Sequence, residues 1–198
     1  MGIEDQVLTD TIFKNNIPVK IFTIDTGRLF NETYETLDRT IARYKKTIQV
    51  YFPDAGDVEE FVLTKGINSF YESVDNRKSC CHIRKVKPLN RALTGAKIWI
   101  TGLRAGQSTN RMEMPMIEWD ESRQLYKFNP LINWTDEDVM DYLGQFNVPY
   151  NRLHDKGFLS IGCAPCTRAV ETGEDPRAGR WWWESSQKEC GLHQTVIK

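Results

Sequence analysis

An apolar run that ends in a polar turn, VKIFTIDTG (19–27), is followed by NETYETLDRTIARYKK (31–46) and then by TIQVYF (47–52). Residues 19–24 do not alternate between apolar and polar, which is typical of a strand covered on both faces, as in a parallel sheet. Residues 31–46 have the periodicity of an amphipathic helix, with Asn31 as the expected N-cap. A strand, a helix and a second strand in this order predict a parallel βαβ unit and therefore an α/β fold.

The rest of the chain continues this alternation. We expect helices at 4–14, 57–66, 79–93 and 134–146, a buried strand at 97–101, and a hairpin formed by 116–119 and 124–128. Capping pairs mark two of the helix starts, Asp57 with Glu60 and Thr135 with Asp138. The periodicity is lost from about Pro149, where we expect loops. We divide the chain into an α/β nucleotide-binding domain over residues 1–160 and a carboxyl-terminal segment over residues 161–198.

Composition limits the classes of function. The 198 residues carry 26 Lys and Arg against 27 Asp and Glu, which gives a net charge of −1. A nearly neutral chain is a poor general partner for nucleic acid. No apolar run approaches the ~20 residues that cross a bilayer, and MGIEDQV (1–7) lacks the basic and apolar regions of a signal peptide. We therefore expect a cytoplasmic protein that binds neither nucleic acid nor membrane.

Five cysteines divide into two tight pairs and one isolated residue. Cys163 and Cys166 form a CxxC turn, whose spacing lets two thiolates bind one metal or cluster, although many such pairs are redox dithiols instead. Cys80 and Cys81 are adjacent, and adjacent side chains diverge on a helix or a strand. A tandem pair therefore suits an extended cluster better than a single tetrahedral ion. Two alternatives remain open, a zinc site and small buried thiols without a metal.

Cations surround the tandem pair and recur in the loops. RKSCCHIRK (77–85) carries Arg77, Lys78, Arg84 and Lys85, which would either offset the charge of a thiolate cluster or form a solvated helix face. Six further arginines lie in predicted loops, where guanidinium groups bind phosphate or sulfate well: Arg28, Arg104, Arg111, Arg168, Arg177 and Arg180. Asp25 directly follows a predicted strand, at the sheet edge where open α/β folds bind ligands.

Cys190 is the cysteine without a neighbour. It lies in KECGLH (188–193), between the cations Lys188 and His193, which would favour its thiolate. A structural cysteine is normally buried in a core, whereas this one lies near a chain end beside Gly191. The residues alone leave two readings open, a nucleophile and an incidental exposed thiol. The tryptophans at 181–183 are expected to hold the chain end against the domain rather than to stack on a ligand.

Six motifs, spread in order over almost the whole chain, resemble the assimilatory sulfonucleotide reductases, specifically the iron–sulfur type that reduces adenylyl sulfate. They are FTIDTGRL (22–29), KSCCHIRKVKPL (78–89), TGLRAGQS (101–108), GCAPCTRAV (162–170), GRWWWE (179–184) and KECGLH (188–193). The tandem cysteines, the CxxC turn and the terminal ECGLH are highly specific in combination.

The resemblance implies a Rossmann-like fold of the adenine-nucleotide α-hydrolase type, with a mostly parallel sheet and a loop-rich carboxyl-terminal tail. It implies a 4Fe–4S cluster on Cys80, Cys81, Cys163 and Cys166. It also implies that Cys190 is the nucleophile on a mobile tail that closes over the substrate. Lys85 is expected between cluster and substrate. The other implied substrate-binding residues are Gly2, Glu4, Asp5, Asp25, Arg28, Arg104, Arg111, Arg177, Arg180 and His193.

The implied activity is the reduction of adenylyl sulfate to sulfite and AMP. Cys190 would take the sulfur group as an S-sulfocysteine, and thioredoxin or a glutaredoxin-like protein would then release sulfite. Because the other four thiols would be bound to the cluster, no thiol is left in the chain to resolve this intermediate, and we expect an external reductant. Whether the protein forms a homo-oligomer is left open.

The first five residues depart from the family pattern. The family's phosphate-binding loop has the form S-x-G-x-E-D after a central strand, and MGIED (1–5) matches only its second half. We therefore expect the amino-terminal strand to be missing and its two neighbours to be unpaired. The same absence predicts that this chain is poorly stable or inactive alone.

Three other functions compete with this one. A reductase of 3′-phosphoadenylyl sulfate is the nearest, although family members of that specificity lack the cluster cysteines. An ATP pyrophosphatase that thiolates tRNA would share the fold, but it needs an intact glycine-rich loop and does not explain ECGLH. A zinc-binding interaction module without catalysis would contain zinc and no sulfide.

Overall fold

The computed structural model describes residues 1–108 and 111–185. Strands β1 (Phe22–Ile24) and β2 (Gln49–Tyr51) are parallel, and helix α2 (Asn31–Tyr44) connects them. The predicted βαβ unit is therefore confirmed. Phe30 occupies the N-cap position of α2 and Asn31 is its first residue, so the prediction of an Asn31 cap is wrong by one residue.

A second sheet contains β3 (Ile98–Ile100), β5 (Leu125–Phe128) and β4 (Ile117–Asp120), in that spatial order. β3 and β5 are parallel, whereas β4 and β5 form the predicted antiparallel hairpin. The α/β class and the mostly parallel pairing of the strands are thus confirmed.

A groove of about 1240 Å³ lies between the two sheets. All residues of β1 and β3 line it, and within the described residues β1 pairs only with β2 and β3 only with β5. The edges of β1 and β3 that border the groove are therefore unpaired, as the sequence predicts. β1 is only half-buried instead of covered on both faces. Apolar contacts still connect the sheets, because Phe22 and Ile24 pack against a core that includes Leu93 and Trp99.

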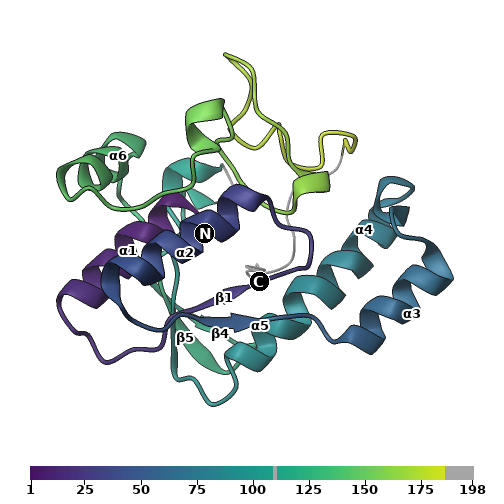
Figure 1. Cartoon of the computed structure of the whole chain (residues 1–198), viewed down its shortest axis with the longest axis horizontal. Helices are drawn as coiled ribbons and strands as arrows, with labels where there is room; N and C mark the ends of the chain where they lie inside the picture. The colour runs from purple at the N-terminus through teal and green to yellow at the C-terminus, as the bar shows by residue number, and fades with distance from the viewer. Residues whose placement is uncertain (109–110, 186–198) are drawn as a thin grey trace.

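Helices surround the sheets (Figure 1). α1 (Ile3–Lys14) and α6 (Asp136–Gln145) share an apolar core that includes Val7 and Val139. α6 has the predicted cap, since the Thr135 hydroxyl accepts a hydrogen bond from the Asp138 N–H at 3.0 Å. α3 (Ala55–Lys65) begins earlier than predicted, because the Asp54 carboxylate caps it instead of Asp57.

A π-helical turn, His82–Val86, joins α4 (Val74–Cys81) to α5 (Lys87–Ala92). The three elements replace the single helix predicted at 79–93. α4 begins earlier because the Ser73 hydroxyl caps it by accepting from the Asn76 N–H at 3.1 Å. Short π-helical turns are frequent at functional sites, and this one directly follows Cys81 and contains Lys85.

Loops dominate the described chain after α6, as predicted. Short 3₁₀ turns at His154–Lys156 and Ala164–Cys166 and a bridge between Thr167 and Arg180 give this region its local order. Within the described residues, none of the helices combines the length and the apolarity of a transmembrane span.

We expect the 198-residue chain to unfold with low cooperativity, because the unpaired edges of β1 and β3 leave backbone groups without partners in a sheet. Thermal unfolding followed by circular dichroism should give a broad transition, and an apolar dye should bind the groove before the transition begins. One sharp transition together with full catalytic turnover would contradict this expectation.

Candidate active site

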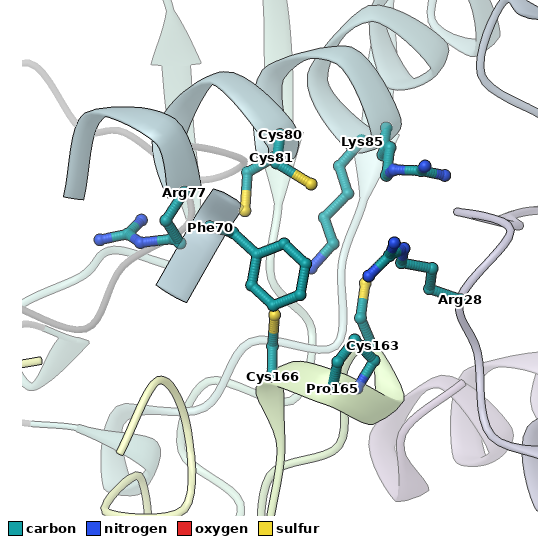
Figure 2. Close-up of a pocket in the computed structure, with 10 residues that line it drawn as sticks. Arg28, Phe70, Arg77, Cys80, Cys81, Lys85, Cys163, Pro165 and Cys166 are labelled. Atoms are coloured by element: carbon teal, nitrogen blue, oxygen red, sulfur yellow. The ribbon is translucent and has the colours of Figure 1, made fainter. Parts of the chain in front are cut away.

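Four cysteines from two distant parts of the chain meet in one pocket (Figure 2). Cys80 and Cys81 end α4, whereas Cys163 precedes the turn Ala164–Cys166 and Cys166 ends it. Each of the four is between 6% and 9% exposed. The remaining lining consists of Phe70, Pro165 and the cations Arg28, Arg77, Arg84 and Lys85. The structure thus brings the two cysteine pairs together in a strongly cationic setting.

The spacing of residues along α4 and the π-helical turn places two of the cations beside the thiols. Arg84 follows Cys80 by four residues, and Lys85 follows Cys81 by four residues, so each cation lies on the same helical face as its cysteine. Arg84 Nη1 donates to the Thr26 carbonyl oxygen at 2.7 Å, which fixes the π-helical turn after α4 against the loop after β1. Lys85 lines both the thiol pocket and the groove, so it lies between the two cavities.

The thiols differ in how readily they lose a proton. Burial raises the pKa of Cys80, and burial together with the neighbouring Cys163 raises the pKa of Cys166 to about 12. Burial opposes the ionisation of Cys163 as well, but Lys85, the Thr26 hydroxyl and Arg180 outweigh it and lower the pKa of this thiol. The Thr26 Oγ1 lies 3.2 Å from the Cys163 Sγ. Cys163 is therefore readier than Cys80 or Cys166 to act as a thiolate ligand.

The four thiols are not arranged around a single ion. Among the described residues, no three His, Cys, Asp or Glu side chains gather closely enough to hold one metal ion. A tetrahedral zinc site needs its sulfur donors at about 2.3 Å from one centre. Four thiols that line one pocket are also the donor type that an iron–sulfur cluster uses, since each of its irons is bound by one cysteine.

The turn after β1 is held by its own side chains. Asp25 Oδ1 accepts from the Gly27 N–H at 2.7 Å and from the Tyr34 hydroxyl at 3.0 Å. Gly27 has a φ of +71°, which favours glycine. Arg28 Nη1 donates to Asn68 Oδ1 at 3.2 Å, and the guanidinium lines the thiol pocket. In this structure Asp25 and Arg28 therefore organise the turn and the pocket.

Arg177 and Arg180 line the groove from the carboxyl-terminal loops. Arg180 is 7% exposed, and its Nη1 donates to Ser160 Oγ at 3.2 Å. Gly162 makes room for it, because a Cβ there would lie 2.4 Å from Arg180 Nη2. The Arg180 Nε is buried and has no acceptor among the described residues. A buried cation with an unused donor beside the groove favours an anionic ligand there.

The first turn of α1 meets the glycine-rich loop after β3. Gly102 packs so closely that a Cβ there would lie 2.8 Å from the Glu4 Cβ. Arg104 is buried and pairs with Glu4 at 2.8 Å and with Asp136 at the start of α6. These ion pairs hold the glycine-rich loop against α1 and α6, at one side of the groove. The groove lining also includes the predicted residues Gly2, Asp5 and Arg111.

Cys190 and His193, the predicted nucleophile and its neighbour, lie outside the described residues. Three contributors were not singled out as site residues from the sequence: Thr26, Phe70 and Gly162. Thr26 could have been found from the sequence, because it lies in the DTG turn next to Asp25, at the predicted ligand-binding edge of the sheet. Phe70 could not have been found from the sequence, because its position in the pocket depends on how the segment between α3 and α4 folds.

Residues 1–169 match the family described as phosphoadenosine phosphosulfate reductase domain. An adenosine 5′-phosphosulfate reductase of Burkholderia cepacia is 52% identical over 198 residues, which are 100% of this chain and 79% of the relative. An adenosine 5′-phosphosulfate reductase of Allochromatium vinosum is 49% identical over 195 residues, which are 98% of this chain and 76% of the relative.

Solved structures show the same fold. A phosphoadenylyl-sulfate reductase from Candida auris, in a phosphate complex, is 34% identical with a TM-score of 0.71, over 85% of this chain and 79% of that one. An FMN adenylyltransferase from Candida glabrata, 16% identical with a TM-score of 0.55 over 92% of this chain and 61% of that one, is similar in fold alone. The predicted Rossmann-like fold of the adenine-nucleotide α-hydrolase type is confirmed.

Glu4→Gln should lower the urea concentration at which the chain unfolds, because it leaves the buried Arg104 charge poorly compensated, at a cost of about 3 kcal/mol. The Glu4 and Arg104 side chains are 11% and 4% exposed. Asp136→Asn is the matched control, since the Asp136 side chain is 83% exposed and its loss should cost under about 1 kcal/mol. Urea unfolding measures both variants, and equal losses would show that Arg104 does not depend on Glu4.

Proposed function

This chain belongs to the phosphoadenosine phosphosulfate reductase family, and we propose that it reduces adenosine 5′-phosphosulfate to sulfite and AMP in assimilatory sulfate reduction. The observation that carries the proposal is the pocket in which Cys80 and Cys81 meet the CxxC turn. The relatives from Burkholderia cepacia and Allochromatium vinosum, which are named for this reaction, support it at 52% and 49% identity.

The groove supports the binding of a nucleotide. Its lining includes the residues at the carboxyl ends of β1 and β3, where open α/β sheets bind their ligands. Gly2, the N-cap of α1, lines the groove, and the N-terminus of a helix favours phosphate. We assign the sulfate and phosphate of the substrate to Lys85, Arg111, Arg177 and Arg180, and a supporting role to Asp25 and Arg28.

Nucleophilic attack by Cys190 is the proposed first step. The thiolate attacks the sulfur atom of the substrate's sulfate, an S–S bond forms, and the S–O bond to the phosphate breaks. AMP leaves with the electron pair of that bond, and cations around its phosphate stabilise the leaving group. The chain is left with an S-sulfocysteine at Cys190, and His193 is proposed to assist from the same segment.

A dithiol protein of the thioredoxin or glutaredoxin type is the proposed reductant. One of its thiolates attacks the Cys190 Sγ, and sulfite leaves with the electron pair of the S–S bond. The second thiol of the reductant then closes a disulfide and frees Cys190. The four cysteines in the described residues are buried and form no disulfide with one another, which is consistent with an external reductant.

We further propose a 4Fe–4S cluster on the four pocket cysteines. Four cysteines beside four cations suit its negative charge, and the buried Nε1 atoms of Trp181 and Trp183 have no acceptor among the described residues. When bound, the cluster supplies a fixed negative charge beside Lys85. Residues 161–198 would then contribute half of the ligands as well as the nucleophile, which supports treating them as a functional segment.

Initial rates with adenosine 5′-phosphosulfate and with its 3′-phosphorylated form test the substrate. We expect kcat/KM to be about a hundredfold higher for the first nucleotide, because the site would reject the additional phosphate. The reverse preference would assign this chain the specificity named for the Candida auris enzyme.

Cys190→Ser should abolish sulfite release, because a hydroxyl is a far weaker nucleophile than a thiolate. Bound iron should be unchanged, and this separates loss of the nucleophile from loss of the pocket. Sulfite release by the variant at the wild-type rate would remove Cys190 from the mechanism.

Iron and acid-labile sulfide should be found in equal amounts after anaerobic purification. Cys166→Ser should lose most of both, because one of four ligands is removed, while Cys190→Ser is the matched control and should keep both. Zinc without sulfide would show that the pocket holds a different metal.

A further inference from the structure

Arg77 is a fully buried cation in α4, at 1% exposure. It makes a bidentate ion pair with Glu184, with Nε–Oε1 at 3.0 Å and Nη2–Oε2 at 2.9 Å. The two side chains are 1% and 4% exposed. Glu184 is near the end of the described residues and six positions before Cys190. The ion pair therefore joins α4 to the beginning of the carboxyl-terminal segment.

Trp181 supports the same junction. Its ring is 0% exposed and belongs to the apolar cluster that contains the four pocket cysteines. The guanidinium groups of Arg77 and Arg180 lie 4.6 Å and 4.7 Å from its centroid. Cations against an aromatic ring in a water-poor site are attracted to it more strongly than at the surface. The stretch from Arg180 to Glu184 is thus held by two different kinds of contact.

Arg77 also interacts with a pocket thiol. Cys81 lies one turn further along α4, so the two side chains share a face of the helix. Burial alone would lower the pKa of Arg77, but hydrogen bonds and charge interactions with Glu184 and Cys81 raise it. Figure 2 shows Arg77 beside Cys80 and Cys81, with its guanidinium directed away from the centre of the pocket. One guanidinium therefore contacts both the thiol pocket and the carboxyl-terminal segment.

A gain in folding stability does not by itself explain why Arg77 and Glu184 form a buried charged pair. Two buried charges lose their hydration, and an apolar pair of similar volume is often as stable or more stable. A guanidinium has one property that an apolar side chain and a lysine lack: a planar fork that donates in fixed directions to separate acceptors. Here its acceptors belong to two segments that the proposed reaction needs in register.

We propose that Arg77 is a positioning residue, whose guanidinium ties Glu184 to Cys81 and so sets where the carboxyl-terminal segment begins relative to the thiol pocket. The inference rests on the proposed function, in which that segment carries the nucleophile. Its expected role is in turnover and in the environment of Cys81, because Arg77 lines the thiol pocket and is not among the residues that line the groove.

Arg77→Lys and Glu184→Gln test the two ends of this tie. Arg77→Lys keeps the charge and loses the fork, so we expect kcat for sulfite formation to fall about tenfold or more, as for a lost charge-assisted hydrogen bond. KM for the nucleotide and bound iron should stay at wild-type values. The visible absorption band of the iron-bound thiolates should shift, because hydrogen bonds to sulfur tune such clusters. Glu184→Gln should lower kcat in the same way while the band stays in place.

Asp57→Asn is the matched control. It removes a surface ion pair with Lys87, whose side chains are 28% and 47% exposed, and should change neither kcat nor the band. If the single variants unfold, Arg77→Met combined with Glu184→Met keeps an apolar pair in place. We expect this double variant to fold with wild-type iron content and to show the low kcat of Arg77→Lys.

Several outcomes would overturn the inference: kcat of both single variants within twofold of wild type, a fall in kcat that only follows iron loss, or full turnover by the double variant. The proposed function fails separately. If the wild-type chain makes no sulfite, the visible absorption band still tests the inference. A band shift in Arg77→Lys but not in Glu184→Gln supports the proposed link between Glu184 and Cys81. An unshifted band in Arg77→Lys contradicts it.

Discussion

Four thiols and four cations share one buried pocket, and the contacts of these cations link the parts of the chain that surround it. The cysteines come from α4 and from the loop after α6. The cations come from α4, from the π-helical turn that follows it and from the turn after β1. Arg84 fastens the pocket to the turn after β1, and Arg77 fastens it to Glu184. A buried charge without a partner is costly. The loss of one of these contacts would therefore destabilise both of the elements that it joins.

The pocket and the groove are neighbouring cavities with a common wall. Lys85 lines both of them, and Arg180 lines the groove while lowering the pKa of Cys163. An anion in the groove and a negative group in the pocket would therefore be stabilised by the same cations. This arrangement gives a physical reason for the proposed cluster: its negative charge would hold cationic side chains in place before the substrate binds.

Local patterns in the sequence predicted most of the elements and the two cysteine pairs. Apolar periodicity located β1, α2 and β2, and the Thr135 cap located the start of α6, because each signal lies within a few residues. The start of α3 was misplaced because Asp54 and Asp57 both suit a helix cap, and the choice between them depends on the chain that precedes them.

Long-range contacts gave no comparable signal. Arg104 is predicted to bind substrate and lines the groove, but its ion pairs with Glu4 and Asp136, which are distant in sequence, could not be predicted. Arg77 was equally compatible with a solvated helix face, and only the folded chain brings Glu184 and Trp181 to it. Residue type and spacing thus identify the chemistry of a side chain, whereas its partner depends on tertiary packing.

Mass spectrometry of the chain after a single turnover without a reductant tests the central claim most directly. Incubation with adenosine 5′-phosphosulfate should release one equivalent of AMP and no sulfite, and leave a sulfonate adduct on Cys190 alone, because the other four thiols are sequestered in the pocket. Free sulfite without an adduct, or an adduct on any of the four pocket cysteines, would contradict this account.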